Sequence, residues 1–154
     1  MQHSAFDIAP SRLGIAWFRI AIAYLIVGIT LGIVMGATQQ FSMRPVHAHL
    51  NLVGWATGAL AGLLYLFFPR AAESRLGKAH FVLHNLGVPV MMGSLALVLT
   101  GNMSVAPALI AGELATAASV LVFAANLFVN IKAVPAMDSA STARQARAVH
   151  VHGV

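Results

Sequence analysis

Four long apolar stretches restrict the fold of this chain more than any other feature of its sequence. They run over residues 14–37, 46–68, 80–100 and 106–132. Each is close to the roughly 20 residues that an α-helix needs to cross the hydrocarbon core of a bilayer. Only 8% of the 154 residues are charged, whereas soluble domains carry about 25% charged residues. The sequence therefore predicts an all-α membrane protein, with a bundle of four transmembrane helices in residues 1–133.

The segments between the apolar stretches are short, and short connections force neighbouring helices to run antiparallel. After the last stretch the sequence is polar and rich in small residues. We therefore expect residues 134–154 to form a mobile tail.

The basic residues predict how the bundle is oriented. The chain has nine Lys and Arg residues, and only Arg44 falls on one side of the predicted bundle. Because basic residues favour the cytoplasmic side, both termini and the tail are predicted in the cytoplasm, with the bundle in a bacterial inner (cytoplasmic) membrane. No basic run is interleaved with aromatic residues, so we do not expect nucleic acid as a partner.

Glycines recur at intervals of four in the first two stretches. They are Gly28, Gly32 and Gly36 in the first, and Gly54, Gly58 and Gly62 in the second. Such runs allow helix backbones, or a flat ligand, to approach closely. For the first run, contact between helices is the favoured interpretation. For the second both interpretations stay open, because Gly54 lies two turns from His47 on the same face.

A pair of histidines, His47 and His49, stands at the head of the second apolar stretch in the segment RPVHAH. At about 100° per residue, the two side chains leave a regular helix about 200° apart. They cannot both bind one small ion from one helix. In a ring of identical subunits, however, His47 would face one neighbour and His49 the other, and each junction would receive two imidazoles.

Two imidazoles facing each other across an apolar gap suit a haem with two histidine ligands. Arg44 could pair with a haem propionate through its guanidinium group, and Gly54 would leave room for the flat ring. The chain has no cysteine, which excludes the covalent attachment of c-type haem. The alternative is that each histidine only bonds to a carbonyl or a serine.

Three segments resemble the catalytic subunit of the haem–copper oxidases, especially the C-type enzymes. HAHLNLVGWATGALAGLLYLFFPR, residues 47–70, resembles the tenth helix of that subunit. RPVH, residues 44–47, resembles its second helix, and KAHFVLHNLG, residues 78–87, its eleventh. The resemblance implies that this chain corresponds to one of three four-helix arcs, so that a homotrimer would close the ring. It also implies a haem b held by His47 of one subunit and His49 of the next.

The resemblance does not extend to the copper site of that family. Its histidine pair on the seventh helix has no counterpart here, so copper stays possible without its usual ligands. His80 and His84 have the i, i+4 spacing of a chelating pair and form a possible second metal site. They lie toward the cytoplasmic side, and should not share a metal with His47. The alternatives are a structural hydrogen bond for His80, and a proton relay or helix packing for His84.

Polar residues inside the fourth stretch also need a role. Glu113 lies about two turns from its non-cytoplasmic end, and acids within the membrane are usually functional. It could bond to the second nitrogen of a ligand imidazole, relay protons, or be protonated and bonded to Asn51 or Ser94. Asn126 and Asn130 are expected to tie helices together.

These observations predict an electron-transfer cytochrome with haem b and an unidentified redox partner. One alternative is an enzyme that reduces oxygen or nitric oxide at an open haem, with possible copper. Another is a transport or sensor module whose histidines bind metal ions or protons. The sequence leaves open whether the protein is an enzyme.

Overall fold

The structure, a computed structural model, describes residues 11–131. The predicted tail at 134–154, and the basic residues beyond 131, lie outside the described residues. The described part consists of helices and their connections. They are α1 (Arg12–Thr38), α2 (Arg44–His49), η1 (Leu50–Thr57), α3 (Gly58–Phe67), α4 (Pro69–Glu73), α5 (Arg75–Leu99), η2 (Met103–Val105) and α6 (Ala106–Asn130).

Four continuous helical stretches are long and apolar enough to cross a membrane. They are Arg12–Thr38, Arg44–Phe67, Arg75–Leu99 and Met103–Asn130. This confirms the prediction of an all-helical protein with four spanning helices, and supports an integral membrane protein. The ends differ from the predicted ones by a few residues, because caps and turns rather than hydropathy decide where a helix begins. Ser11 and Ser74, for example, cap α1 and α5. Their hydroxyl oxygens accept hydrogen bonds from the backbone N–H groups of Gly14 and Gly77.

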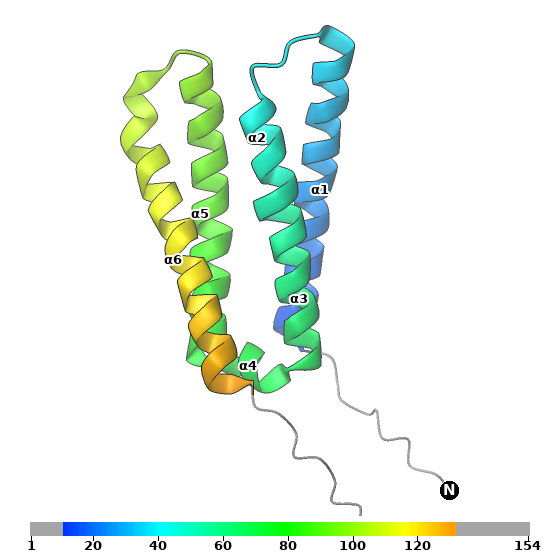
Figure 1. Cartoon of the computed structure of the whole chain (residues 1–154), viewed down its shortest axis with the longest axis vertical. Coiled ribbons are helices and arrows are strands. Elements are labelled where there is room, and N and C mark those ends of the chain that lie inside the picture. The colour runs from blue at the N-terminus through cyan, green and yellow to red at the C-terminus, as the bar shows by residue number, and fades with distance from the viewer. Residues whose placement is uncertain (1–10, 132–154) are drawn as a thin grey trace, which may run out of the picture.

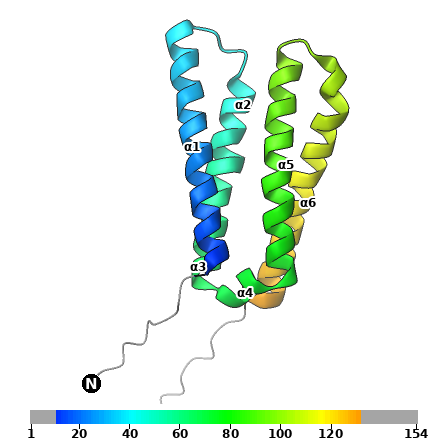
Figure 2. The same cartoon turned by 180° about the vertical axis from the view of Figure 1, so that it is seen from behind.

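The helices form two antiparallel hairpins (Figure 1). In the first, α1 runs beside the continuous span of α2, η1 and α3. In the second, α5 runs beside α6, and Figure 2 shows the same pairing from behind. The short helix α4 joins the hairpins at one end of the bundle. It begins at Pro69, and the preceding Phe68 has the non-helical backbone that a following proline favours.

The outer surface of the bundle is apolar, as expected for a protein that lipid surrounds. Leu52, Leu121 and Phe128 are 66%, 72% and 88% exposed. Two apolar clusters lie inside. The cluster nearer α4 contains Trp17, Ala61, Tyr65, Ala71 and Ala72, and the other contains Val46, Leu50, Val88, Met91 and Met92.

The glycine runs lie where α1 meets the second span. A Cβ atom on Gly28 would lie 2.6 Å from Asn51 Nδ2, and one on Gly32 would lie 2.7 Å from His47 Cε1. A Cβ atom on Gly54 would lie 2.6 Å from Tyr24 Cγ. Contact between helices is therefore confirmed for Gly28 and Gly32 of the first run, but not for Gly36, where a Cβ atom would meet nothing within 4 Å. It also accounts for Gly54, whose role in binding a cofactor stays a prediction.

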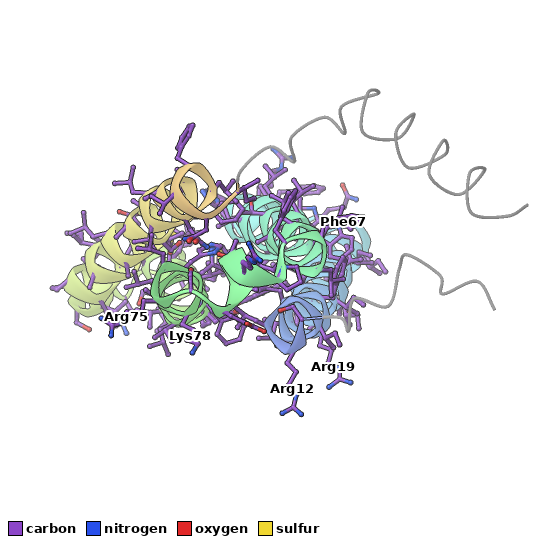
Figure 3. All side chains as sticks on the ribbon, turned by 90° about the horizontal axis from the view of Figure 1, so that it is seen from below. Arg12, Arg19, Phe67, Arg75 and Lys78 are labelled. Atoms are coloured by element: carbon purple, nitrogen blue, oxygen red, sulfur yellow. The ribbon has the colours of Figure 1, made fainter. Side chains whose placement is uncertain are left out.

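Basic side chains gather at the α4 end of the bundle. Arg12, Arg19, Arg75 and Lys78 project from one side of the bundle when it is viewed from this end (Figure 3). Arg44 begins α2 at the opposite end. Within the described residues, the charge asymmetry predicted from the sequence is therefore present in three dimensions.

The second span contains a feature that the sequence pattern did not predict. Residues Leu50–Thr57 form a π-helix directly after His49, and the Thr57 hydroxyl donates to the Leu52 carbonyl five residues back, at 2.9 Å. π-helical turns are rare and occur often at functional sites. The histidine pair itself lies in the regular helix α2, so the angle predicted between its two side chains applies.

We predict that Gly28→Ala destabilises the bundle, because the added methyl group would overlap the Asn51 side chain. Overpacking of this kind costs about 1–3 kcal/mol. Gly36→Ala is the matched control, since a Cβ atom there meets nothing within 4 Å. Thermal unfolding in detergent should show a lower midpoint for Gly28→Ala and an unchanged or raised one for Gly36→Ala. Equal midpoints for the two variants would contradict the proposed contact.

Candidate functional site

Two histidine pairs lie near opposite ends of the bundle. His47 and His49 are in α2, close to the loop that follows α1, whereas His80 and His84 are in the half of α5 nearer α4 (Figure 1). The separation agrees with the expectation that the two pairs do not share a metal. Each pair is described below from its hydrogen bonds.

The His47 side chain points toward α1 and is half-buried. Its Nδ1 lies 2.8 Å from the Gly28 carbonyl oxygen, and the ring occupies the notch that Gly32 leaves open. Asn51 donates to the His47 carbonyl at 2.8 Å. A carbonyl can only accept, so Nδ1 of His47 carries the hydrogen and Nε2 has the free lone pair.

The His49 side chain is exposed and points away from the bundle. Its Nδ1 lies 2.7 Å from the Pro45 carbonyl oxygen, which again places the hydrogen on Nδ1 and a lone pair on Nε2. A hydrogen bond from Nδ1 to a backbone carbonyl is the arrangement that orients a histidine whose Nε2 binds a metal. Both histidines thus form the carbonyl bond that was considered as the alternative to metal binding. The same bonds leave Nε2 of each ring without a partner, and the two rings face different directions.

Arg44 and Glu113 are the other predicted site residues near this end. Arg44 is exposed, and its guanidinium carbon lies 4.4 Å from the centre of the Phe41 ring. Glu113 is exposed on α6, between Ile110 and Leu114, which are 56% and 66% exposed. The alternative of a bond from Glu113 to Asn51 or Ser94 is not realised in the structure, and Asn51 donates to the His47 carbonyl instead. An acid on an apolar face within the membrane is costly, which points to contact with another molecule.

The second pair belongs to a fully buried polar cluster. Nδ1 of His80 lies 2.8 Å from the Tyr65 hydroxyl, so the structural hydrogen bond considered for His80 is present. Asn126 donates to the same hydroxyl at 3.1 Å and to the Ala71 carbonyl at 3.0 Å. Ser74 donates to the Asn126 side-chain oxygen at 2.9 Å. Asn126 thus ties α6 to α3 and α4, as predicted.

His84 completes this cluster together with residues that the sequence did not single out. Its Nδ1 lies 3.4 Å from the Ser119 hydroxyl. The Trp17 ring packs on both imidazoles, with centroids 4.6 Å from His80 and 4.9 Å from His84. Ser119 could have been found from the sequence as one of several polar residues within the apolar fourth stretch. The others are Thr116, Asn126 and Asn130. No comparable signal marks Trp17.

Within residues 11–131, no three His, Cys, Asp or Glu side chains are grouped so that they could hold a metal ion. His80 and His84 would thus offer at most two protein ligands of this kind. A copper or other second metal site there stays a prediction.

Comparison with protein families, with curated proteins and with solved structures finds no match for this chain. The likeness to haem–copper oxidases therefore rests on the segments quoted above.

We predict that Tyr65→Phe destabilises the protein, because it leaves His80 Nδ1 and an Asn126 N–H group buried without their partner. The loss of such a bond costs about 1–3 kcal/mol. Tyr24→Phe is the control, since Tyr24 is the only other tyrosine and its ring is half-buried. Chemical denaturation in mixed micelles should show a clear decrease in the free energy of unfolding for Tyr65→Phe. The decrease for Tyr24→Phe should be smaller. A larger loss in the control would refute this account of the cluster.

Proposed function

We propose that the protein is a b-type cytochrome of the membrane, with each haem held between two copies of the chain. His47 of one copy and His49 of the next would supply the two iron ligands. The observation that carries this proposal is the tautomer of the pair. Each Nδ1 is tied to a backbone carbonyl at 2.8 and 2.7 Å, which leaves Nε2 free to bind iron.

The direction of the two side chains supports a haem shared between copies. His47 points toward α1, whereas the exposed His49 points outward. They are two positions apart on a regular helix, so one chain cannot supply both ligands to one iron. In the proposed ring, the outward-facing His49 of one copy would meet the haem that His47 of the next copy holds beside its own α1. The resemblance to one arc of the oxidase subunit favours three copies.

The surrounding residues fit a haem at this end of the bundle. Arg44 is exposed at the start of α2, five residues before His49, where its guanidinium group would pair with a propionate. The Gly32 notch, together with the Gly28 carbonyl, holds the His47 ring in place. When bound, the haem would supply reversible one-electron chemistry at its iron. The chain's own residues orient the ligands and neutralise the propionates.

Electron transfer follows from two ligands per iron, because an iron with six bonds has no open position for a substrate. The basic α4 end would face the cytoplasm of a bacterial cell, by the preference of basic residues for that side. Glu113 would lie on the face of α6 that a neighbouring copy covers, near the level of His49.

We predict that His47→Ala and His49→Ala each abolish the bis-histidine haem spectrum, because each removes one ligand from every junction. Leu52→Ala is the control, since Leu52 is exposed one turn beyond His49 and carries no ligand. Absorbance spectra of the purified variants measure the result. Loss of the spectrum in only one histidine variant would show that the pair does not act across copies.

We also predict that carbon monoxide leaves the spectrum of the reduced protein unchanged. Both axial positions of the iron would be occupied by imidazole, so the gas has no free position to bind. Absorbance before and after exposure to the gas is the measurement. A shifted Soret band would instead favour the alternative, an enzyme that reduces oxygen or nitric oxide at an open haem.

A further inference from the structure

The buried cluster on the α4 side of the bundle has a definite order of hydrogen bonds. One atom of the Asn126 side-chain amide lies 3.0 Å from the Ala71 carbonyl oxygen. Because a carbonyl oxygen only accepts hydrogen bonds, that amide atom must be the nitrogen. The same nitrogen donates its second hydrogen to the Tyr65 oxygen. The Tyr65 hydroxyl is then free to donate to Nδ1 of His80. His80 must therefore carry its own hydrogen on Nε2.

The order on the other side of the cluster fixes His84 in the opposite tautomer. The Ser119 hydroxyl donates to the Thr116 carbonyl at 2.6 Å, which uses the only hydrogen of that hydroxyl. Toward His84 the Ser119 oxygen can only accept, so Nδ1 of His84 carries the hydrogen. Nε2 of His84 then has a lone pair.

Two chains of hydrogen bonds thus point the same way, and each ends at an unpartnered ring nitrogen. One runs from Asn126 through Tyr65 and ends on a donor, the Nε2–H group of His80. The other begins with an acceptor, Nε2 of His84, and runs through Ser119. Neither Nε2 atom has a hydrogen-bond partner, although both side chains are fully buried. The two ring centres are 5.8 Å apart.

A third unpartnered group lies against both imidazoles. Nε1 of Trp17 is buried, donates to no other group and belongs to a ring that contacts His80 and His84. The three rings therefore present two donors and one acceptor. A water molecule, with two lone pairs and two hydrogens, matches that set.

We propose that one water molecule binds among the ring nitrogens of Trp17, His80 and His84. It would accept from Trp17 and His80 and donate to His84. It would join the two chains into a single hydrogen-bonded network that runs from Tyr65 to Ser119. The proposal does not depend on haem, and it assigns the second histidine pair a role without a metal.

Nitrogen-15 NMR of the whole protein labelled in histidine tests the proposal. We expect the Nε2–H tautomer for His80 and the Nδ1–H tautomer for His84, with signals assigned by His80→Gln and His84→Gln. Tyr65→Phe should change the His80 tautomer, and Ser119→Ala that of His84. Ser94→Ala, a buried serine elsewhere on α5, is the control and should change neither.

The same tautomer on both histidines would overturn the proposal. The Val53 backbone is a competing partner for His84, because it is placed to accept a hydrogen bond from the His84 ring, although Nε2 makes no bond of full hydrogen-bond geometry. A hydrogen found on Nε2 of His84 would show that Val53, rather than water, is its partner.

Exchange with deuterated water is a second measurement that does not require a variant to fold. The Nε2–H group of His80 should exchange far faster than the backbone N–H group of Val88, which is fully buried two turns further along α5. Protection of His80 equal to that of Val88 would exclude a water molecule in contact with the ring.

Discussion

Hydrogen bonds from imidazole to backbone carbonyls are the interactions on which the proposed chemistry depends. Inside a bilayer an unpaired polar group costs several kcal/mol, so each histidine needs a partner. Nδ1 of His47 donates to the Gly28 carbonyl, and Nδ1 of His49 donates to the Pro45 carbonyl. These bonds use one nitrogen of each ring and fix where the hydrogen lies. The second nitrogen of each ring, Nε2, is then left free for a ligand in the proposed function.

The two halves of the bundle satisfy polar groups in different ways. Near α4, an inward-facing network joins α3, α4, α5 and α6 through Tyr65, His80 and Asn126. Near the other end, His49 and Glu113 point outward on an apolar surface. An interior network stabilises a single chain, whereas exposed polar groups at membrane depth favour assembly. In the proposed assembly, a neighbouring copy would cover this outward-facing surface.

The four spanning helices could be predicted from hydropathy alone, because length and apolarity are sufficient to specify them. The glycine contacts and the ties made by Asn126 followed from spacing and from the cost of polar groups in lipid. The π-helix after His49 could not be predicted, since LNLVGWAT has no pattern that distinguishes it from an α-helix. Nor could the cluster around Trp17, which depends on residues from α1, α5 and α6 meeting in three dimensions.

Haem content measured together with the mass of the assembly tests the central claim most directly. A pyridine haemochrome assay on detergent-purified protein identifies the haem and counts it, while light scattering gives the number of chains per particle. Shared ligation between copies predicts haem b at one per chain, in a closed assembly of three chains. Stoichiometric bis-histidine haem in a strictly monomeric particle, or purified protein that binds no haem, would contradict it.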